Sequence, residues 1–411
     1  TREREWASRG PSSKAGHDVL EVNHIGLASQ AADETSTEQT WRICRRSANT
    51  TGICRREVCV CGWVASSLTC RMVCRYLLRL KTHLSGREGR PVRAAQLVAP
   101  RKWELLDLEK PKATDGTMLV RLERVAICGT DKPSYVGLSP SYPLDPGNTG
   151  HEGLGIVESC PSGKYREGER VLLWAFDRGL FQEYVLARDE GCVRLPADGE
   201  LNVILMSQLL GTVIHAFYKL GNIIGTKVVV LGQGPVGQLF NATLRNLGAR
   251  QIIAVDPLAH RLDTARKMGA TDTVDPAPGD LKQSIADLTG GELADIVVEA
   301  VGREETFNLA AGLVRRNGSI VYFGVPNKDN HEGIISLQFM KMFANEVRII
   351  TTVGPNPQKD YSLALDWIVQ GRLDVRPMIS HVLPFEEIQR AFEMAFDCPG
   401  EHETVKVVMR M

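Results

Sequence analysis

Residues 228–237 read VVVLGQGPVG, and this stretch decides the fold. The apolar run 228–231 is typical of a buried strand, and three glycines follow it in a G-x-G-x-x-G pattern. Apolar residues then recur at helical spacing from Val236 to Leu247, and Gly248 is a typical helix-ending residue. A second apolar run, 251–255, ends at Asp256. The pattern predicts a strand, a glycine turn, a helix and a second strand.

Each glycine of this turn has a distinct role. Gly232 allows the tight turn, Gly234 lets the backbone approach a pyrophosphate, and Gly237 lets helix and strand pack closely. Asp256 follows Gly237 by 19 residues and can accept hydrogen bonds from a ribose 2'-hydroxyl, while its charge repels a 2'-phosphate. A glycine-rich turn without a ligand is the alternative, but the strand, the helix and the acid all occur at the positions that a dinucleotide motif requires. We therefore predict a dinucleotide site that prefers NAD to NADP.

Length and charge limit the functional classes. The chain has 411 residues, enough for two or three domains with their own cores. Its formal net charge is zero, so nothing in the total argues for nucleic acid or an anionic membrane as a partner. No apolar stretch approaches the ~20 residues that a membrane helix needs. Four widely spaced cysteines fit a reducing compartment, and we expect a cytoplasmic protein: Cys128, Cys160, Cys192 and Cys398.

Residues 1–90 differ from the rest in composition. They are rich in Arg, Ser and Cys, and show little sustained apolar periodicity. A zinc module would need paired cysteines with a second pair or histidines at a workable spacing, and a transit peptide would avoid the acids present here. We favour a disordered or non-native extension that activity does not require. The other six of the ten cysteines lie in this segment: Cys44, Cys54, Cys59, Cys61, Cys70 and Cys74.

Regular patterns begin near Pro91. Apolar segments at 94–98, 103–108 and 118–127 predict strands, and Pro111 breaks the chain between the last two. Strand patterns with Pro and Gly turns continue to about residue 195, and helical patterns then alternate with apolar runs. An all-β start followed by a βαβ series predicts two domains of an α/β protein.

Metal-ligand residue types follow the longest predicted strand. Cys128 ends this strand within the text CGTD, and His151 and Glu152 lie in the text GHEG. A thiolate, an imidazole and a carboxylate are ligands that zinc favours, and a catalytic zinc keeps one position open for substrate. Taken alone, Cys128 and His151 are weak evidence for a metal site, because a buried cysteine and a core histidine are commoner than a metal site.

The ordered motifs CGTD, GHEG and GQGPVG with the strand-ending Asp256 resemble the medium-chain dehydrogenase/reductase superfamily, which contains zinc alcohol, sorbitol and threonine dehydrogenases. The resemblance spans about Pro91 to Met411. It implies a GroES-like β-barrel catalytic domain over 91–205, a Rossmann cofactor domain with a doubly wound parallel sheet over 206–350, and a segment 351–411 that returns to the catalytic domain. Further pieces match in order: Gly168–Val171, Phe181–Tyr184, Glu299–Gly302 and Gly318–Val321.

The resemblance also assigns roles at the metal. It implies that Cys128 and His151 bind one catalytic zinc, that Thr130 takes the proton of the substrate alcohol, and that Glu152 lies beside the metal and can coordinate it. The position of the third ligand, usually Cys or Glu, is Gln208, a neutral and weaker ligand. We assign all four of Cys128, His151, Glu152 and Gln208 to zinc; the alternative is that the metal is lost and these residues only pack.

The same resemblance implies further cofactor contacts and an assembly. Pro235, Val236, Val301 and Val325 are expected to contact NAD together with the three glycines and Asp256. A homodimer or homotetramer is expected, and the apolar segment 320–323 is interpreted as an exposed strand edge that invites pairing.

Two departures from the family pattern are visible. The histidine that often extends the proton relay is Pro133, so the proton must leave from Thr130 through cofactor ribose or water. The interval 171–184, where many relatives carry a four-cysteine structural zinc lobe, has no cysteine. The sequence therefore predicts a zinc-dependent NAD(H) oxidoreductase that interconverts a secondary alcohol, polyol or sugar and its carbonyl. A zinc-free quinone or enoyl reductase of the same fold and a non-enzymatic dinucleotide-binding protein remain as alternatives.

Overall fold

The computed structural model describes residues 91–174, 179–277, 279–326 and 334–411. The chain divides into two compact units, Thr1–Ser85 and Gly86–Met411, and the described residues all belong to the second. The predictions for residues 1–90, including their six cysteines, lie outside the described residues. None of the helices in the described ranges is long and apolar enough to cross a membrane.

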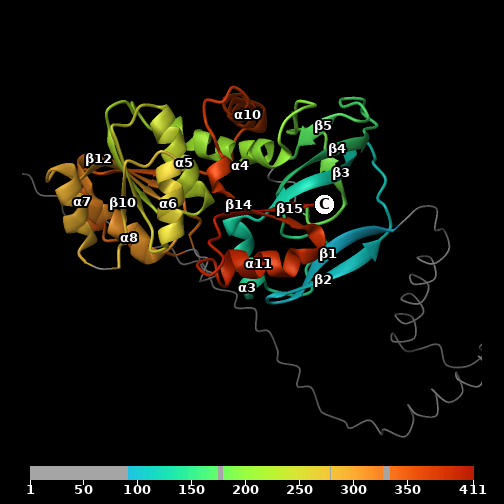
Figure 1. The fold of residues 1–411 in the computed structure, drawn as a ribbon, viewed down its shortest axis with the longest axis horizontal. Helices are drawn as coiled ribbons and strands as arrows, with labels where there is room; N and C mark the ends of the chain where they lie inside the picture. The colour runs from blue at the N-terminus through green and yellow to red at the C-terminus, as the bar shows by residue number, and fades with distance from the viewer. Residues whose placement is uncertain (1–90, 175–178, 278, 327–333) are drawn as a thin grey trace, which may run out of the picture. The chain divides into compact units, whose positions relative to one another are not determined.

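The first sheet is built around one long strand. Strand β3 pairs antiparallel with β4, β6 and β15, and the sheet order is β14-β15-β3-β4-β5-β7 (Figure 1). The three strands predicted near the start are present, each within two residues of its expected bounds. Strands β1 Val92–Ala99 and β2 Lys102–Leu108 pair with each other as a separate two-stranded sheet. The other bounds are β3 Thr117–Ala126, β4 Glu152–Ser159, β5 Arg170–Leu172, β6 Tyr184–Arg188, β7 Val193–Arg194, β14 Ile379–Pro384 and β15 Lys406–Arg410.

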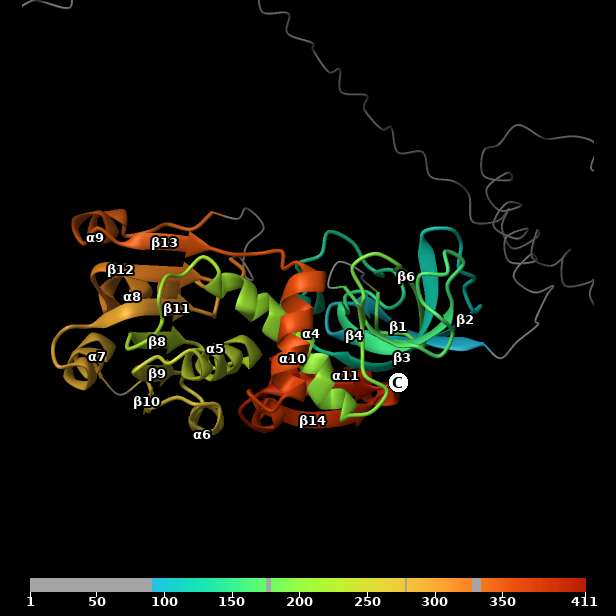
Figure 2. The same cartoon turned by 90° about the horizontal axis from the view of Figure 1, so that it is seen from above.

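The second sheet is parallel, with the order β10-β9-β8-β11-β12-β13 (Figure 2). The predicted strand, glycine turn, helix and strand are confirmed as β8, α5 and β9. Strand order reverses between β8 and β11, and ligands of such sheets bind at this reversal. The bounds are β8 Lys227–Leu231, β9 Gln251–Val255, β10 Asp272–Val274, β11 Ala294–Glu299, β12 Val314–Tyr322 and β13 Arg348–Thr351.

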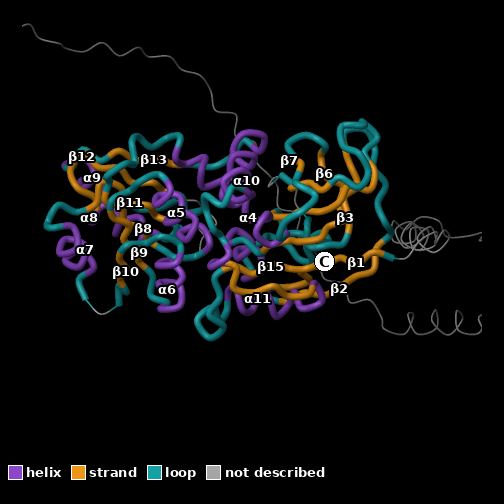
Figure 3. Tube along the Cα trace, turned by 45° about the horizontal axis from the view of Figure 1, so that its top comes forward, coloured by secondary structure: helices purple, strands orange, loops and turns teal. Residues whose placement is uncertain are grey.

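Helices bury both faces of the parallel sheet, as Figure 3 shows. Val228 and Val230 belong to the core beneath α4, α5 and α10, whereas Val229 and Leu231 belong to the core beneath α7 and α8. Because both faces of β8 are buried, its sequence is a continuous apolar run in which apolar and polar residues do not alternate. The bounds are α3 Lys132–Val136, α4 Leu201–Phe217, α5 Pro235–Asn246, α6 Ala259–Lys267, α7 Leu281–Thr289, α8 Glu304–Leu313, α9 Phe339–Ala344, α10 Ser362–Val369 and α11 Ile388–Phe396, with short helical turns η1 Gly129–Asp131, η2 Pro357–Tyr361, η3 Arg376–Met378 and η4 Phe385–Glu387.

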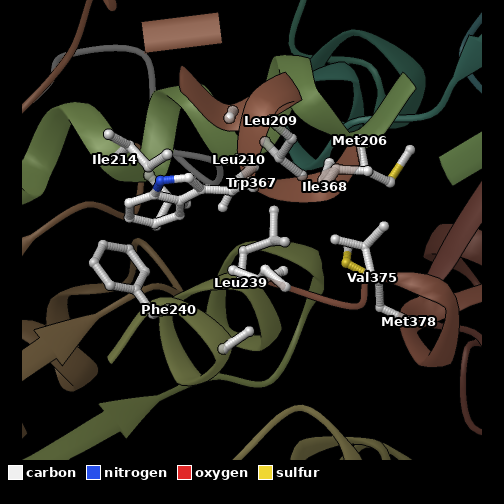
Figure 4. Packing of buried hydrophobic residues seen from close by; sticks show 14 of the residues in the cluster. Met206, Leu209, Leu210, Ile214, Leu239, Phe240, Trp367, Ile368, Val375 and Met378 are labelled. Atoms are coloured by element: carbon white, nitrogen blue, oxygen red, sulfur yellow. The ribbon is translucent and has the colours of Figure 1, made fainter. Parts of the chain in front are cut away.

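Helix α4 links the two sheets. It contacts β3 and β4 of the first sheet and α5, a helix that covers the second sheet. Leu210 and Ile214 of α4 pack with Leu239 and Phe240 of α5 and with Trp367 of α10 in one core (Figure 4). The boundary expected at 205/206 thus falls inside a continuous helix. Residues 379–410 supply β14 and β15 to the first sheet, so the end of the chain lies beside β3.

The expected strand edge at 320–323 is wrong. These residues lie at the end of β12, which pairs with β11 on one side and β13 on the other, so β13 is the edge strand on this side of the sheet. The sequence reading did not include β13, because it is only four residues long and too short for a periodic pattern.

Candidate metal and cofactor site

The register of β3 and β4 brings the metal-ligand residues together. Ala126 pairs with Glu152 across these antiparallel strands, so the residue pair just beyond, Cys128 and His151, lies at the same end of the sheet. One donor atom from each of Cys128, His151 and Glu152 lies within 4.8 Å of the other two. Cys128 precedes the turn η1, and its backbone amide donates to Asp131 Oδ2 at 2.8 Å.

The surroundings of His151 orient its ring. Its Nδ1 lies 3.4 Å from the carbonyl oxygen of Thr149 and 3.5 Å from Asp131 Oδ1. Two oxygen acceptors on this side place the ring proton on Nδ1 and leave the Nε2 lone pair for another partner. Nε2 lies 3.2 Å from Thr130 Oγ1. The ring is thereby oriented as a metal ligand through Nε2, next to the hydroxyl expected to move the proton.

Negative groups surround the imidazole. Burial lowers the pKa of His151, but the charges of and hydrogen bonds to Cys128 and Asp131 outweigh burial and hold this pKa well above its ordinary value. Asp131 is fully buried, and its Oδ1 accepts a 2.7 Å hydrogen bond from Thr149 Oγ1. The charges around the ring therefore favour a positive charge at His151.

Glu152 forms a buried ion pair that the sequence did not reveal. Lys406 Nζ lies 2.6 Å from Glu152 Oε2 and also donates to the carbonyl oxygen of Ile127 at 2.9 Å. Both charged side chains are at most 1% exposed. Glu152 Oε1 is buried and has no hydrogen-bond partner among the described residues. One carboxylate oxygen is thus held by the lysine, and the other remains available.

Gln208 occupies the middle of α4 and is 2% exposed. Its Nε2 donates to the hydroxyl of the fully buried Tyr361 at 3.4 Å. Its Oε1 is buried without a hydrogen-bond partner in the described part of the chain. A buried polar atom without a partner costs roughly 1–3 kcal/mol, so such atoms call for an explanation.

These donors fit a zinc ion. The gathered set offers one sulfur, one imidazole nitrogen and one carboxylate, of which Glu152 Oε1 has no hydrogen-bond partner among the described residues, and Gln208 adds a second buried oxygen without such a partner. Sulfur and imidazole ligands favour zinc over magnesium or calcium, which prefer oxygen alone. A metal would also neutralise the negative charge and satisfy the buried oxygens.

A cavity of about 600 Å³ joins this site to the glycine turn. Its lining includes Cys128 together with Gly234, Pro235, Val236 and Val301, and it also reaches Gly232 and Asp256. The cavity therefore extends from the metal-ligand cluster to the reversal of strand order, which is where a dinucleotide would lie.

The three glycines behave as their predicted roles require. Gly232 has a φ of +88°, and a Cβ there would lie 2.6 Å from Val301 Cγ2. A Cβ at Gly237 would lie 1.9 Å from the carbonyl oxygen of Gly232, so helix and turn touch directly. Nothing lies within 4 Å of a Cβ placed at Gly234, which leaves this backbone open for a pyrophosphate.

Asp256 stands at the end of β9 and is 4% exposed. Its Oδ2 accepts from the amide of Gln233 at 2.7 Å, and its Oδ1 accepts from the amide of Leu258 at 2.9 Å. Arg261 approaches it, with 3.8 Å between the guanidinium and Oδ2. Burial lowers the pKa of Arg261, and the Asp256 charge acts in the opposite direction. The end of β9 therefore carries an acid with a cation beside it.

The remaining predicted residues have clear positions. Val325 follows β12 and is 46% exposed; it is not part of the cavity lining, and its carbonyl oxygen packs against Gly302. Tyr135 is fully buried and donates to Asp397 at 2.8 Å, so it is a core residue.

Three functional candidates were missed by sequence reasoning: Asp131, Lys406 and Tyr361. Asp131 is part of the CGTD text, and its place three residues after the cysteine was a usable signal. Lys406 interrupts the apolar run 405–409, and a charged residue inside a buried strand indicates a buried partner. Nothing in the sequence points to Tyr361, because it meets Gln208 only through tertiary packing.

Known proteins match both halves of this arrangement. The alcohol dehydrogenase GroES-like domain family matches residues 114–197, and the zinc-binding dehydrogenase family matches residues 235–370. An alcohol dehydrogenase of Cupriavidus necator is 28% identical over 352 residues, which cover 74% of this chain and 94% of the relative. The D-arabitol-phosphate dehydrogenase of Enterococcus avium is 26% identical over 324 residues, covering 71% and 90%.

Solved structures share the fold. An alcohol dehydrogenase from a Thermus species superposes with a TM-score of 0.68 at 24% identity, covering 77% of this chain and 99% of that one. The two sheets, the ordered motifs and these matches all indicate the same family. The chain belongs to the medium-chain dehydrogenase/reductase superfamily of oxidoreductases, among its zinc-type alcohol and polyol dehydrogenases.

Proposed function

We propose that this protein is a zinc-dependent, NAD(H)-linked dehydrogenase that interconverts a secondary alcohol, polyol or sugar with its carbonyl compound. One observation carries the proposal: Cys128, whose sulfur lies within 4.8 Å of donor atoms of His151 and Glu152, lines a cavity that is also lined by the glycine turn and Asp256. Hydride transfer needs substrate and nicotinamide side by side, and a shared cavity supplies that arrangement.

Zinc held by Cys128, His151, Glu152 and Gln208 would act as a Lewis acid that lowers the pKa of a substrate hydroxyl. NAD in the cavity would accept the hydride at its nicotinamide ring. The protein's own groups orient these partners. Asp131 and Thr149 fix the ring of His151, and Lys406 fixes one oxygen of Glu152.

Thr130 is the proposed proton acceptor. Its hydroxyl lies 3.2 Å from His151 Nε2, beside the nitrogen left for a metal, and the residue is exposed. Solvent can therefore take the proton from Thr130 directly or through the cofactor ribose. This exposure explains how the site can work with Pro133 where many relatives carry a relay histidine.

The preference for NAD over NADP rests on Asp256. Its two oxygens are held by backbone amides, so its charge is fixed in the ribose position and would repel a 2'-phosphate. Arg261 offsets part of this charge from 3.8 Å. We therefore propose a preference for NAD that is weaker than a lone acid would give.

A homodimer through the edge of the parallel sheet is also proposed. The side of β13 away from β12 has no strand partner among the described residues. Helix α9 next to it exposes Phe339, Met340 and Phe343 by 59%, 72% and 66%. Large apolar side chains beside an open strand edge favour pairing with a second copy.

The cysteines of the described ranges are free thiols, which supports a reducing compartment such as the cytoplasm.

Zinc counting and turnover test the proposed reaction. Purified full-length protein should carry zinc and reduce NAD with members of a panel of polyols and secondary alcohols. Cys128→Ser should lose one zinc ion together with turnover, and Thr130→Val should keep that ion but lose roughly 10²–10⁴-fold in rate. Cys160→Ser, another half-buried cysteine, should change neither. Turnover without zinc would favour the reductase alternative, and NAD binding without turnover would favour a non-enzymatic protein.

A further inference from the structure

A second group of metal-ligand side chains lies in the turn between α11 and β15. Donor atoms of Cys398, Glu401 and His402 lie within 4.8 Å of one another. The sequence analysis treated Cys398 only as one of several scattered cysteines. The group is separate from the Cys128 site and shares no residue with it.

The backbone of this turn holds the three side chains together. The amide of His402 donates to the carbonyl of Cys398 at 3.4 Å, and the amide of Thr404 donates to the carbonyl of Pro399 at 2.8 Å. Glu403 has a φ of +50°, an uncommon backbone conformation for a residue other than glycine. The donors are thus gathered by a folded turn, which lowers the entropy cost of binding an ion.

The donors have little other use in the described structure. Cys398 Sγ makes one weak contact, 3.6 Å to the carbonyl oxygen of Glu393. The side chains of Glu401 and His402 have no hydrogen bond or ion pair with any described residue. The cysteine is half-buried and Glu401 is exposed, so an ion can reach the group from solvent.

The turn also contacts the cofactor domain. Pro399 lines the cofactor cavity, and a Cβ at Gly400 would lie 3.4 Å from Leu258, which follows Asp256 by two residues. The carbonyl oxygen of Thr404 lies 3.3 Å from His260 Nε2 and 3.3 Å from Arg261 Nε, both on α6. The turn that gathers the three donors therefore packs against the segment that follows Asp256.

We infer that Cys398, Glu401 and His402 form a second, solvent-accessible site for a zinc-class divalent cation. A thiolate and an imidazole select a borderline or soft ion, and magnesium and calcium should not compete, because they prefer oxygen ligands. Three protein ligands leave a coordination position for water, so this ion should exchange more readily than one held by four.

Cobalt(II) is the probe, because thiolate ligation gives it a charge-transfer absorption. Full-length protein stripped of metal is titrated with Co²⁺, and bound ions are counted after gel filtration. Cys398→Ser and His402→Ala should each bind one ion fewer than the wild type, and Cys398→Ser should lose the matching share of the sulfur absorption. Cys160→Ser, the matched control, should bind as many ions as the wild type.

Two comparisons keep the outcome independent of the proposed reaction. Cys128→Ser should lose a different ion, so the Cys128/Cys398 double variant should lose two ions. Thermal unfolding of each variant checks that it is folded, and His402→Ala tests the site without changing a thiol. If folded Cys398→Ser and His402→Ala both bind as many ions as Cys160→Ser, the second site does not exist, whatever the result at Cys128.

Discussion

Replacing Lys406 by Met tests how the metal site is built. Met keeps the length and the apolar stem of lysine but removes the charge that faces Glu152 at 2.6 Å. Because the two side chains are 0% and 1% exposed, Glu152 would be left as an uncompensated buried charge. Breaking a buried pair on one side costs about 3–5 kcal/mol. At roughly 1.5 °C per kcal/mol for a folded unit the size of Gly86–Met411, the unfolding midpoint of metal-free protein should fall by about 4–7 °C.

The assay is thermal unfolding in the presence of a chelator and again with added zinc. Zinc should recover more of the loss in Lys406→Met than it adds to the wild type, because the freed Glu152 carboxylate gains a positive partner that binds only the folded state. The double variant Glu152→Gln/Lys406→Met should lose less than the sum of the single variants, with a coupling of about 2–3 kcal/mol.

Lys227→Met is the matched control. Lys227 Nζ also contacts a carboxylate, Glu292 at 2.6 Å, and a backbone carbonyl, that of Thr289 at 2.7 Å. Glu292 is 71% exposed, so water can solvate it after the substitution, and the loss of stability should be much smaller than for Lys406→Met. The reasoning is refuted if metal-free Lys406→Met is no less stable than Lys227→Met.

Three further predictions concern the ligand set, the cofactor and the assembly. Gln208→Glu should tighten zinc retention and slow turnover, since an added charge makes the metal a poorer Lewis acid, whereas Gln208→Ala should only weaken retention. Atomic emission measures the zinc retained, and steady-state kinetics measures turnover. If Gln208→Glu changes neither quantity, Gln208 is not a metal ligand. Asp256→Ala should reduce the NAD over NADP preference by roughly tenfold, about 1.4 kcal/mol, in titrations of both cofactors; tighter NADP binding by the wild type would contradict the role of Asp256. Phe343→Glu places a charge on the apolar surface of α9 and should turn dimers into monomers in sedimentation, while a wild type that is already monomeric at micromolar concentration would rule out the dimer.

Local patterns predicted the cofactor half of the molecule well. The run 228–237 carries a strand, a turn that only glycine can make and a helix start within ten residues, so its structure depends on neighbours in the sequence. The strands that precede Cys128 were predicted for the same reason. By contrast, β13 is short and its place at the sheet edge depends on β12, and nothing in its four residues indicates that neighbour.

The partners at the metal site could not be read from spacing. Lys406 and Glu152 are 254 residues apart in the sequence, and Gln208 and Tyr361 are 153 apart. Both pairs form because the chain returns to the first sheet after completing the second. The family resemblance supplied Gln208 as a ligand position, but only tertiary packing shows that its amide nitrogen has a partner and its oxygen does not.

The last part of the chain connects the two halves of the site. Strand β15 pairs with β3 and carries Lys406 to Glu152, while the turn before it contacts α6 through the carbonyl of Thr404. Arg261 makes one of these contacts and also approaches Asp256. The distance along the chain from Thr404 to Lys406 is two residues, so a shift of this turn would be felt at both the ribose position and the metal ligands. This link gives a physical reason why the cofactor cavity and the metal site would respond to each other.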